Sequence, residues 1–269
     1  MAGRSGAPEA REPVSTRSRA GSWAIDAIEG LGRLGMFSGR SLAMAVVPPW
    51  RARLLFEAMH DVGVGSLFIV VLTGVFSGAV FSLQSVSAFR LFDAESMVGT
   101  TVALTLSREL GPVLTALMVA GRSGSSMATT LGTMRVTEQI DAMEVMAVDP
   151  AHYLVTPRIV ATVVMLPLLT MLFTFVGMVG AYIVAVGMLD VDPGMFLGNL
   201  EGIVEPTDLV YGGIKAMVFG LAISSIGCYK GFYARGGAKG VGEATTESVV
   251  AGSVSVLVMN YFLTAVMFG

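Results

Sequence analysis

The residues best suited to chemistry in this sequence are three charged side chains inside apolar stretches: Arg108, Glu109 and Lys215. Arg108 and Glu109 divide one stretch into twelve apolar or small residues before them and twelve after them. A charge at the centre of a bilayer costs about 2.5–3.5 kcal/mol even on the most lenient scale, so such residues usually face a partner or a water-filled cavity. They therefore predict either a buried binding site or ion pairs that hold a helix bundle together.

The residues next to these charges bear on both the binding site and the ion pairs. Gly111 and Pro112 follow the pair directly, and Pro112 has no N–H to donate to the carbonyl of Arg108. We therefore expect the helix to be weakened at this turn. Broken helices at membrane depth recur at transporter substrate sites. Lys215 lies about 9 Å from the outer end of its own stretch at the helical rise. From there it could snorkel to the surface, bind an anionic headgroup or pair with Glu109.

The composition indicates what kind of chain carries these residues. Only 14% of the 269 residues are charged and the net charge is −3, whereas an average soluble domain is about 25% charged. An intrinsically disordered chain needs high net charge and a nucleic-acid-binding protein needs a basic excess, so both classes are excluded. Instead, five apolar stretches are long enough to cross a membrane. These spans cover about residues 62–89, 96–121, 159–189, 209–229 and 248–268.

The third span is the longest, and it could bend at Pro167 or turn near Gly187. With five spans, the orientation follows from the basic residues outside them. Fourteen Lys and Arg residues lie on one side, in residues 1–61, 122–158 and 230–247, against Arg90 alone on the other. The positive-inside rule then predicts a cytoplasmic N-terminus and a C-terminus on the far side. That far side carries an acidic group: Asp190, Asp192, Glu201, Glu205 and Asp208.

The N-terminal part precedes the first span. Residues 1–22 are polar and rich in Gly and Arg, which predicts a disordered cytoplasmic tail rather than a signal peptide with an apolar core. Residues 23–61 are predicted to hold an amphipathic helix in the membrane interface and a connection, because apolar residues recur near helical spacing between charges. A sixth, poorly formed span over 23–47 is the alternative. Residues 62–269 form the membrane domain.

Two features lie between the second and third spans. Ala120, Gly124, Ala128 and Gly132 form a small-residue ladder that allows close helix packing, either within this chain or between subunits. A short amphipathic helix follows and ends before Pro150. Its acidic residues predict either a solvated face or, as we favour, a docking surface for a basic groove on a partner. The segment includes Glu138, Gln139, Asp141, Met143 and Glu144.

The sequence shows no catalytic constellation and no metal-ligand spacing around its two histidines. The Gly-rich segment at Lys239 lacks both the spacing and the following Ser or Thr of a phosphate-binding loop. If ATP drives this protein, another chain must hydrolyse it. We therefore expect no enzyme activity, no metal and no cofactor in this chain.

The run Leu106-Ser-Arg-Glu-Leu-Gly-Pro-Val-Leu-Thr-Ala-Leu117, with Gly132-Thr-Met-Arg-Val-Thr-Glu-Gln-Ile-Asp-Ala-Met-Glu144, resembles the MlaE (YrbE) permeases. The resemblance covers roughly residues 50–269. It implies the permease subunit of an ABC transporter that moves phospholipid between the inner and outer membranes of a double-membraned bacterium. The fold expected is all-α and polytopic, with five spans, the interfacial helix and the cytoplasmic coupling helix.

The resemblance also implies partners and residue roles. The partners would be a second copy of this chain, a cytoplasmic ABC ATPase that binds the ATP, and a periplasmic MCE-domain lipid-binding protein. Arg108, Glu109 and Lys215 would lie at the lipid site, and the Glu138–Glu144 segment would couple to the ATPase. The alternative from a different class is a stand-alone ion-coupled transporter or channel, in which the three buried charges form the ion pathway. A purely structural scaffold would leave those charges unexplained.

Overall fold

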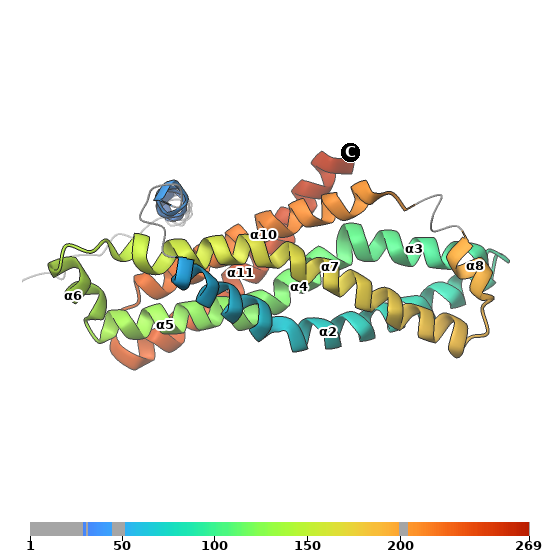
Figure 1. The fold of residues 1–269 in the computed structure, drawn as a ribbon, viewed down its shortest axis with the longest axis horizontal. Helices are drawn as coiled ribbons and strands as arrows, with labels where there is room; N and C mark the ends of the chain where they lie inside the picture. Colours follow the sequence, from blue (N-terminus) through green and yellow to red (C-terminus); the bar gives the residue numbers. More distant parts are fainter. Residues whose placement is uncertain (1–28, 31, 45–51, 199–203, 269) are drawn as a thin grey trace, which may run out of the picture.

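The computed structural model describes residues 29–30, 32–44, 52–198 and 204–268. Within them the chain is an elongated bundle of helices without a β-strand (Figure 1). Five helical segments have the length and apolar composition of membrane spans, as predicted. They are Ala52–Arg90, Glu95–Val136, Ala151–Gly187, Pro206–Phe232 and Gly237–Met267.

Three of these segments are built mainly from one helix each: α2 (Ala52–Arg90), α10 (Pro206–Phe232) and α11 (Gly237–Phe268). The second comprises η1 (Glu95–Met97), α3 (Val98–Thr105), η2 (Leu106–Leu110), α4 (Gly111–Val119), η3 (Ala120–Gly124) and α5 (Ser125–Val136). The third comprises η4 (Ala151–Val155) and α7 (Thr156–Gly187). Pro167 lies inside α7, which ends at Gly187, where the sequence suggested a turn.

The turn at which the helix was expected to be weakened is irregular but not interrupted. It is η2, a π-helical turn in which the N–H of Gly111 bonds to the carbonyl of Leu106, five residues earlier. Pro112 then falls in the first turn of α4, where the missing N–H of proline is best tolerated. The chain therefore passes the two charges as a continuous helix, with a π-bulge of the kind that often marks a functional site.

The two ends of the bundle are distinct (Figure 1). The short helix α6 (Gln139–Val145) lies at one end, and the short helix α8 (Pro193–Gly198) lies at the other. We call them the α6 end and the α8 end. The described N-terminal residues 29–30 and 32–44 are helical, and Figure 1 shows this helix end-on beside the α6 end. It runs across the bundle axis, as an interfacial helix does and a sixth span would not. The predicted tail 1–22 and residues 23–28 lie outside the described residues.

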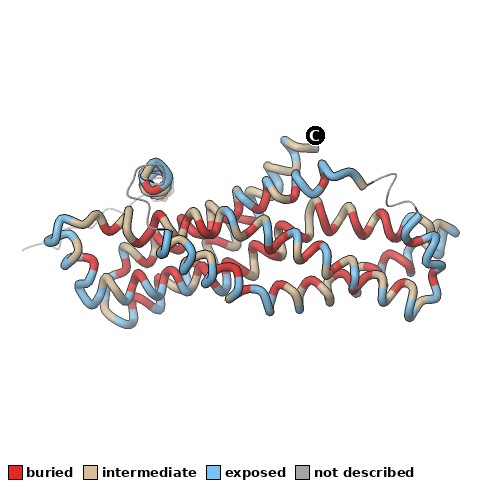
Figure 2. Tube along the Cα trace, viewed as in Figure 1, coloured by how far each residue is buried: buried red, intermediate tan, exposed pale blue. Residues whose placement is uncertain are grey.

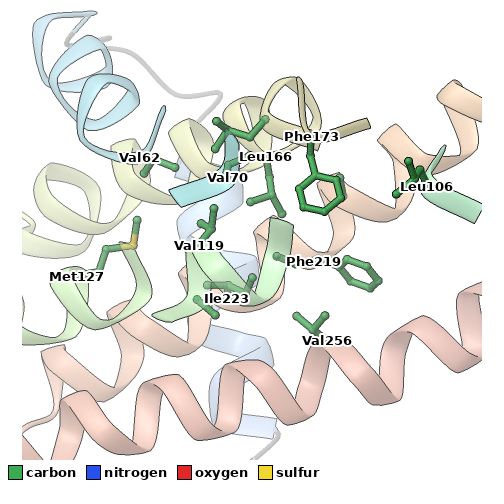
Figure 3. Packing of buried hydrophobic residues seen from close by; sticks show 14 of the residues in the cluster. Val62, Val70, Leu106, Val119, Met127, Leu166, Phe173, Phe219, Ile223 and Val256 are labelled. Atoms are coloured by element: carbon green, nitrogen blue, oxygen red, sulfur yellow. The ribbon is translucent and has the colours of Figure 1, made fainter. Parts of the chain in front are cut away.

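Small residues let the helices approach closely. A Cβ on Gly78 of α2 would lie 1.9 Å from the carbonyl oxygen of Gly177 in α7, and one on Gly180 would lie 2.3 Å from that of Val75. In a membrane such packing replaces the hydrophobic effect as the force between helices. Buried residues accordingly follow the inner faces of the helices (Figure 2). Figure 3 shows larger side chains filling the centre, among them Phe173 of α7 and Phe219 of α10.

The α2–α7 contact yields a stability prediction. Gly78→Ala places a methyl group against the backbone of α7. We expect this overpacking to lower the free energy of unfolding by about 1–3 kcal/mol. Gly187→Ala is the control, because nothing lies within 4 Å of its Cβ position, and it should be neutral or slightly stabilising. The measurement is the thermal transition of the purified protein in mild detergent. Equal transitions for the two variants would contradict close α2–α7 packing.

Candidate functional site

The ammonium of Lys215 lies at the centre of the candidate site. Its side chain is fully buried, and Nζ donates to Glu109 Oε1 at 2.7 Å. Nζ also donates to Thr264 Oγ1 at 2.8 Å and to the carbonyl of Arg108 at 3.0 Å. An ammonium has three protons, so these three acceptors account for all of them. Lys215 therefore takes the pairing with Glu109 rather than snorkelling to the surface.

Arg108 points to a different partner. Its Nε donates to Asp208 Oδ1 at 2.7 Å, and Nη2 lies 2.6 Å from the same oxygen. Asp208 is buried, and its other oxygen accepts the backbone N–H of Glu205, which closes a capping box at the start of α10. Asp208, assigned from the sequence to an acidic outer face, is thus one half of a buried ion pair that joins η2 to α10.

A third helix completes the site. On α11, Asn260 Nδ2 donates to Glu109 Oε2 at 3.2 Å, and the hydroxyl of Thr264 lies 3.2 Å from both carboxylate oxygens. Asn260 Oδ1 is buried and has no hydrogen-bond partner among the described residues. Glu109 is therefore held by one cation, one amide and one hydroxyl, all from α10 and α11.

A glycine on α10 allows these contacts to form. A Cβ on Gly212 would lie 2.2 Å from the carbonyl oxygen of Ser107, so a side chain at this position would push α10 away from η2. Gly212 lies between Asp208 and Lys215, the two α10 residues that pair with η2. Close approach of the two backbones is thus a condition for both ion pairs.

The resulting group has two cations and two anions, so its charges cancel. It remains accessible in part, because 36% of the Arg108 side chain and 34% of the Glu109 side chain are exposed. The other two charged residues, Asp208 and Lys215, are buried. The arrangement contains no nucleophile paired with a base. It is suited to binding a polar or zwitterionic group beside apolar helices.

The sequence-predicted charges are thus brought together, although Arg108 and Glu109 do not neutralise each other. Consecutive residues on a helix point in different directions, so each reaches its own partner on α10. Sequence reasoning missed Asp208, Asn260 and Thr264. Asn260 and Thr264, one helical turn apart, are polar residues within the predominantly apolar residues 256–268, and this spacing was the signal available.

The small-residue ladder packs within this chain. A Cβ on Gly124 would lie 3.3 Å from Ile223 of α10, and one on Gly132 would lie 3.3 Å from Val241 of α11. Ala120 and Ala128 are buried as well. The ladder therefore joins η3 and α5 to α10 and α11.

The acidic segment forms α6 at the tip of the bundle. Ile140 is buried and Met143 packs against the core, whereas Glu138, Gln139, Asp141 and Glu144 are exposed. Helical spacing in the sequence predicts Val136, Ile140, Met143 and Ala147 on one face. Val136 and Ala147 are exposed, because α6 spans only Gln139–Val145 and both lie outside it. Asp141 pairs with Arg135 at 2.6 Å. Exposed apolar residues lie beside the acidic ones, with Val145 89% and Met146 67% exposed.

Within the described residues, no group of three or more His, Cys, Asp or Glu side chains is placed to hold a metal ion.

Comparison with known proteins adds independent information. A family model described as Permease MlaE matches residues 55–266. A probable ABC transporter permease protein of Rickettsia felis is 43% identical over 92% of this chain and 96% of its own length. The intermembrane phospholipid transport system permease protein MlaE of Haemophilus influenzae is 40% identical over 95% of this chain and 98% of its own. The chloroplastic protein TRIGALACTOSYLDIACYLGLYCEROL 1 of Arabidopsis thaliana is 38% identical over 81% of this chain and 62% of its own.

The ion pair between Lys215 and Glu109 is testable by a pair of variants. Lys215→Met leaves the Glu109 carboxylate without its cation. We expect the free energy of unfolding to fall by about 3 kcal/mol, which is the low end of the range for broken buried pairs, because Glu109 is partly exposed. The double variant Lys215→Met/Glu109→Gln removes the orphaned charge and should recover much of that loss. Thermal transitions in detergent measure both. If the double variant is as unstable as the sum of its single variants, the two residues are not coupled.

Proposed function

Because this chain belongs to the MlaE permease family, we propose that it is the membrane-spanning subunit of an ABC transporter that moves phospholipid between two membranes. The main support from the structure is the charge network around Lys215. Its four charges are paired inside an apolar bundle, yet Arg108 and Glu109 each keep about a third of the side chain exposed. A phospholipid combines a charged headgroup with apolar chains, and it matches such a site chemically.

In this proposal Arg108, Glu109 and Lys215 form the lipid site with distinct roles. The guanidinium of Arg108 is the group for the lipid phosphate, because a planar fork suits phosphate oxygens. Glu109 offers a carboxylate to a positively charged headgroup. Lys215 is buried and bonded to Glu109, so it positions that carboxylate rather than contacting lipid.

The permease subunit itself is not catalytic, and in the proposal ATP is bound by a separate ABC ATPase. The surface proposed for that partner is α6, with Glu138, Gln139, Asp141, Met143 and Glu144. Glu138 at its start and Ala147 just beyond its end both have positive φ, at 60° and 59°. Non-glycine residues adopt this conformation only where surrounding contacts hold them. A tip held in this way is suited to transmit motion from a docked partner.

The proposal extends to further partners and to the membrane. The apolar face of α11 supports a homodimer, because it is left largely uncovered. Only 11% of the residues in the most apolar 18-residue part of α11 are buried, against 56% in that of α10. An MCE-domain lipid-binding protein would meet the α8 end on the periplasmic side. The basic residues gathered at the α6 end support a cytoplasmic N-terminus and an inner-membrane location, with the C-terminus periplasmic.

The lipid role predicts a transport defect. Arg108→Gln should lower ATP-dependent transfer of labelled phospholipid by about tenfold, as for the loss of one charge-assisted hydrogen bond. The measurement uses the complete complex reconstituted between donor and acceptor vesicles. Arg90→Gln is the matched control, since Arg90 lies outside the network and pairs with Glu95. Unchanged transfer in Arg108→Gln would refute the lipid role. Transfer by this chain alone, driven by an ion gradient, would favour the secondary-transporter alternative.

The docking role predicts a defect in assembly. Glu144→Lys reverses a charge on α6 that has no ion pair among the described residues, so it should abolish copurification of the ATPase in mild detergent. Asp141→Lys is less informative, because it also breaks the pair with Arg135. Glu243→Lys is the control, as an exposed acidic residue near the start of α11, whose 3.7 Å contact with the exposed Lys239 contributes little. A stoichiometric complex with Glu144→Lys would argue against docking through α6.

A further inference from the structure

At the α6 end, a cavity of about 320 Å³ lies between α2, the η3–α5 segment and the start of α7. Two arginines line it, Arg122 from η3 and Arg158 from α7. Residues of the Lys215 network are absent from its lining. It is therefore separate from the site already described.

Both guanidinium groups are held by backbone rather than by carboxylates. Arg122 Nη1 donates to the carbonyl of Asp61 at 2.9 Å, and Arg158 Nη1 donates to that of Leu154 at 2.5 Å. The Arg122 guanidinium lies against Gly65, where a Cβ would come within 2.2 Å of Nη1. Within the described part of the chain, no carboxylate oxygen lies within 4.0 Å of either group. Two cations are thus fixed in place with their charge uncompensated, and each keeps further N–H donors.

An apolar groove adjoins this polar cavity and shares Arg122 with it. The groove is lined by Ile69 of α2, Leu117 and Met118 of α4, and by Gly121 and Ser125. A single arginine thus borders a polar cavity on one side and an apolar groove on the other. This combination fits an amphiphile with an anionic group between its head and its chain.

The depth of these residues agrees with a lipid lying in a membrane leaflet. Asp61, Arg122 and Arg158 each directly flank one of the spans predicted from the sequence, and the structure brings all three to one cavity. Ile69, Leu117 and Met118 lie inside spans. The cations are therefore at the level of lipid headgroups and the groove is at the level of acyl chains.

The rest of the lining indicates the kind of headgroup. Glu57 and Asp61 supply carboxylates, and Glu57 also pairs with the exposed Arg53 at 2.9 Å. Ser126 and Thr130 supply hydroxyls. The Asp61 side chain is 87% exposed, and its one ion-pair neighbour among the described residues is His60, at 3.9 Å. Cations for a phosphate and carboxylates for an ammonium occur together, which complements a zwitterionic headgroup.

We propose that this cavity and its groove form a second phospholipid site, in the leaflet at the α6 end, that prefers an aminophospholipid such as phosphatidylethanolamine. Arg122 and Arg158 bind the phosphate, Glu57 and Asp61 face the ammonium, and one acyl chain lies along Leu117 and Met118. The inference rests on the proposed function, because the second site would hold the transported lipid in the leaflet opposite the MCE partner.

The test uses site-specific photo-crosslinking in the complete complex in vesicles. A diazirine amino acid at Leu117 reports the groove, and one at Phe68, which is 76% exposed on α2, reports bulk lipid. The probe is labelled phosphatidylethanolamine as a minor component of phosphatidylcholine vesicles. We expect capture at Leu117 to exceed that at Phe68, and to exceed capture of labelled phosphatidylglycerol at Leu117.

Ser126→Glu is the decisive variant, because it places an anion in the cavity while leaving both arginines intact. We expect it to lower capture at Leu117 by about tenfold, as for the loss of a charge-assisted hydrogen bond. Thr133→Glu adds the same charge at an exposed position of α5 outside the cavity lining, so it should leave capture at Leu117 unchanged. Neither variant should alter capture at Phe68. Arg122→Gln/Arg158→Gln should match Ser126→Glu, with Lys239→Gln as a neutral control at an exposed cation. Elution of each complex as a single folded species excludes misfolding as the cause.

Three outcomes would overturn the proposal: equal capture at Leu117 and Phe68, no response to Ser126→Glu, or no preference for the amino headgroup. Loss of capture on adding millimolar inorganic phosphate would show a site for free phosphate instead of lipid. Failure here is distinguishable from failure of the proposed function. If Arg108→Gln abolishes transfer while capture at Leu117 is unchanged in the cavity variants, only the proposal of the second site is wrong. If Arg108→Gln transfers lipid normally, the role of the first site is wrong whatever happens at Leu117.

Discussion

The structure depends on one constraint, which is that every charge inside the apolar bundle must be compensated there. Arg108 and Glu109 are consecutive, so they point in different directions and need separate partners. Asp208 and Lys215 provide these partners from the same helix, seven residues and therefore about two turns apart. Two ion pairs along α10 fix both its rotation and its position along η2. A single pair would leave α10 free to pivot.

The backbone of the second span is adapted to this pairing. Had that span been a regular α-helix, Pro112 would have left the carbonyl of Arg108 without its usual donor. In the structure Lys215 Nζ donates to that same carbonyl at 3.0 Å. The π-helical turn and the buried ammonium together satisfy groups that the proline would otherwise leave unpaired, which is required where no water can replace them. Gly212 is part of the same solution, because only a residue without a Cβ lets α10 approach the carbonyl of Ser107.

Much of this architecture could be predicted from the sequence, because apolar length and charge position are local properties. These properties predict the five spans and a helix near Glu144, and they single out Arg108, Glu109 and Lys215 as candidate site residues. Which helices are neighbours is a property of the packed bundle, so the sequence offered the pair of Lys215 with Glu109 only as one alternative and missed the partner of Arg108. Asp208 lies at the edge of a span, so hydropathy could not distinguish a buried partner of Arg108 from a solvated acid. A weakened turn at Pro112 was predicted, but its π-helical form was not, because that form depends on Lys215 donating to the carbonyl of Arg108 from another helix.

The two arginine-containing sites differ in a way that matters for moving a lipid. Arg108 contacts a buried carboxylate through Nε and Nη2, so a lipid phosphate that binds these same nitrogens must displace Asp208. Asp208 also caps α10, and a phosphate that displaced it would loosen the start of that helix and the register of Lys215 with it. Arg122 and Arg158 have no such competitor among the described residues, because they donate to backbone carbonyls and keep further N–H groups for a phosphate. In the proposed transporter, binding at the α6 end therefore requires no rearrangement, whereas binding at Arg108 is coupled to movement of α10. A site that accepts lipid without rearrangement suits its capture, and a site where binding opens a helix contact suits its transfer.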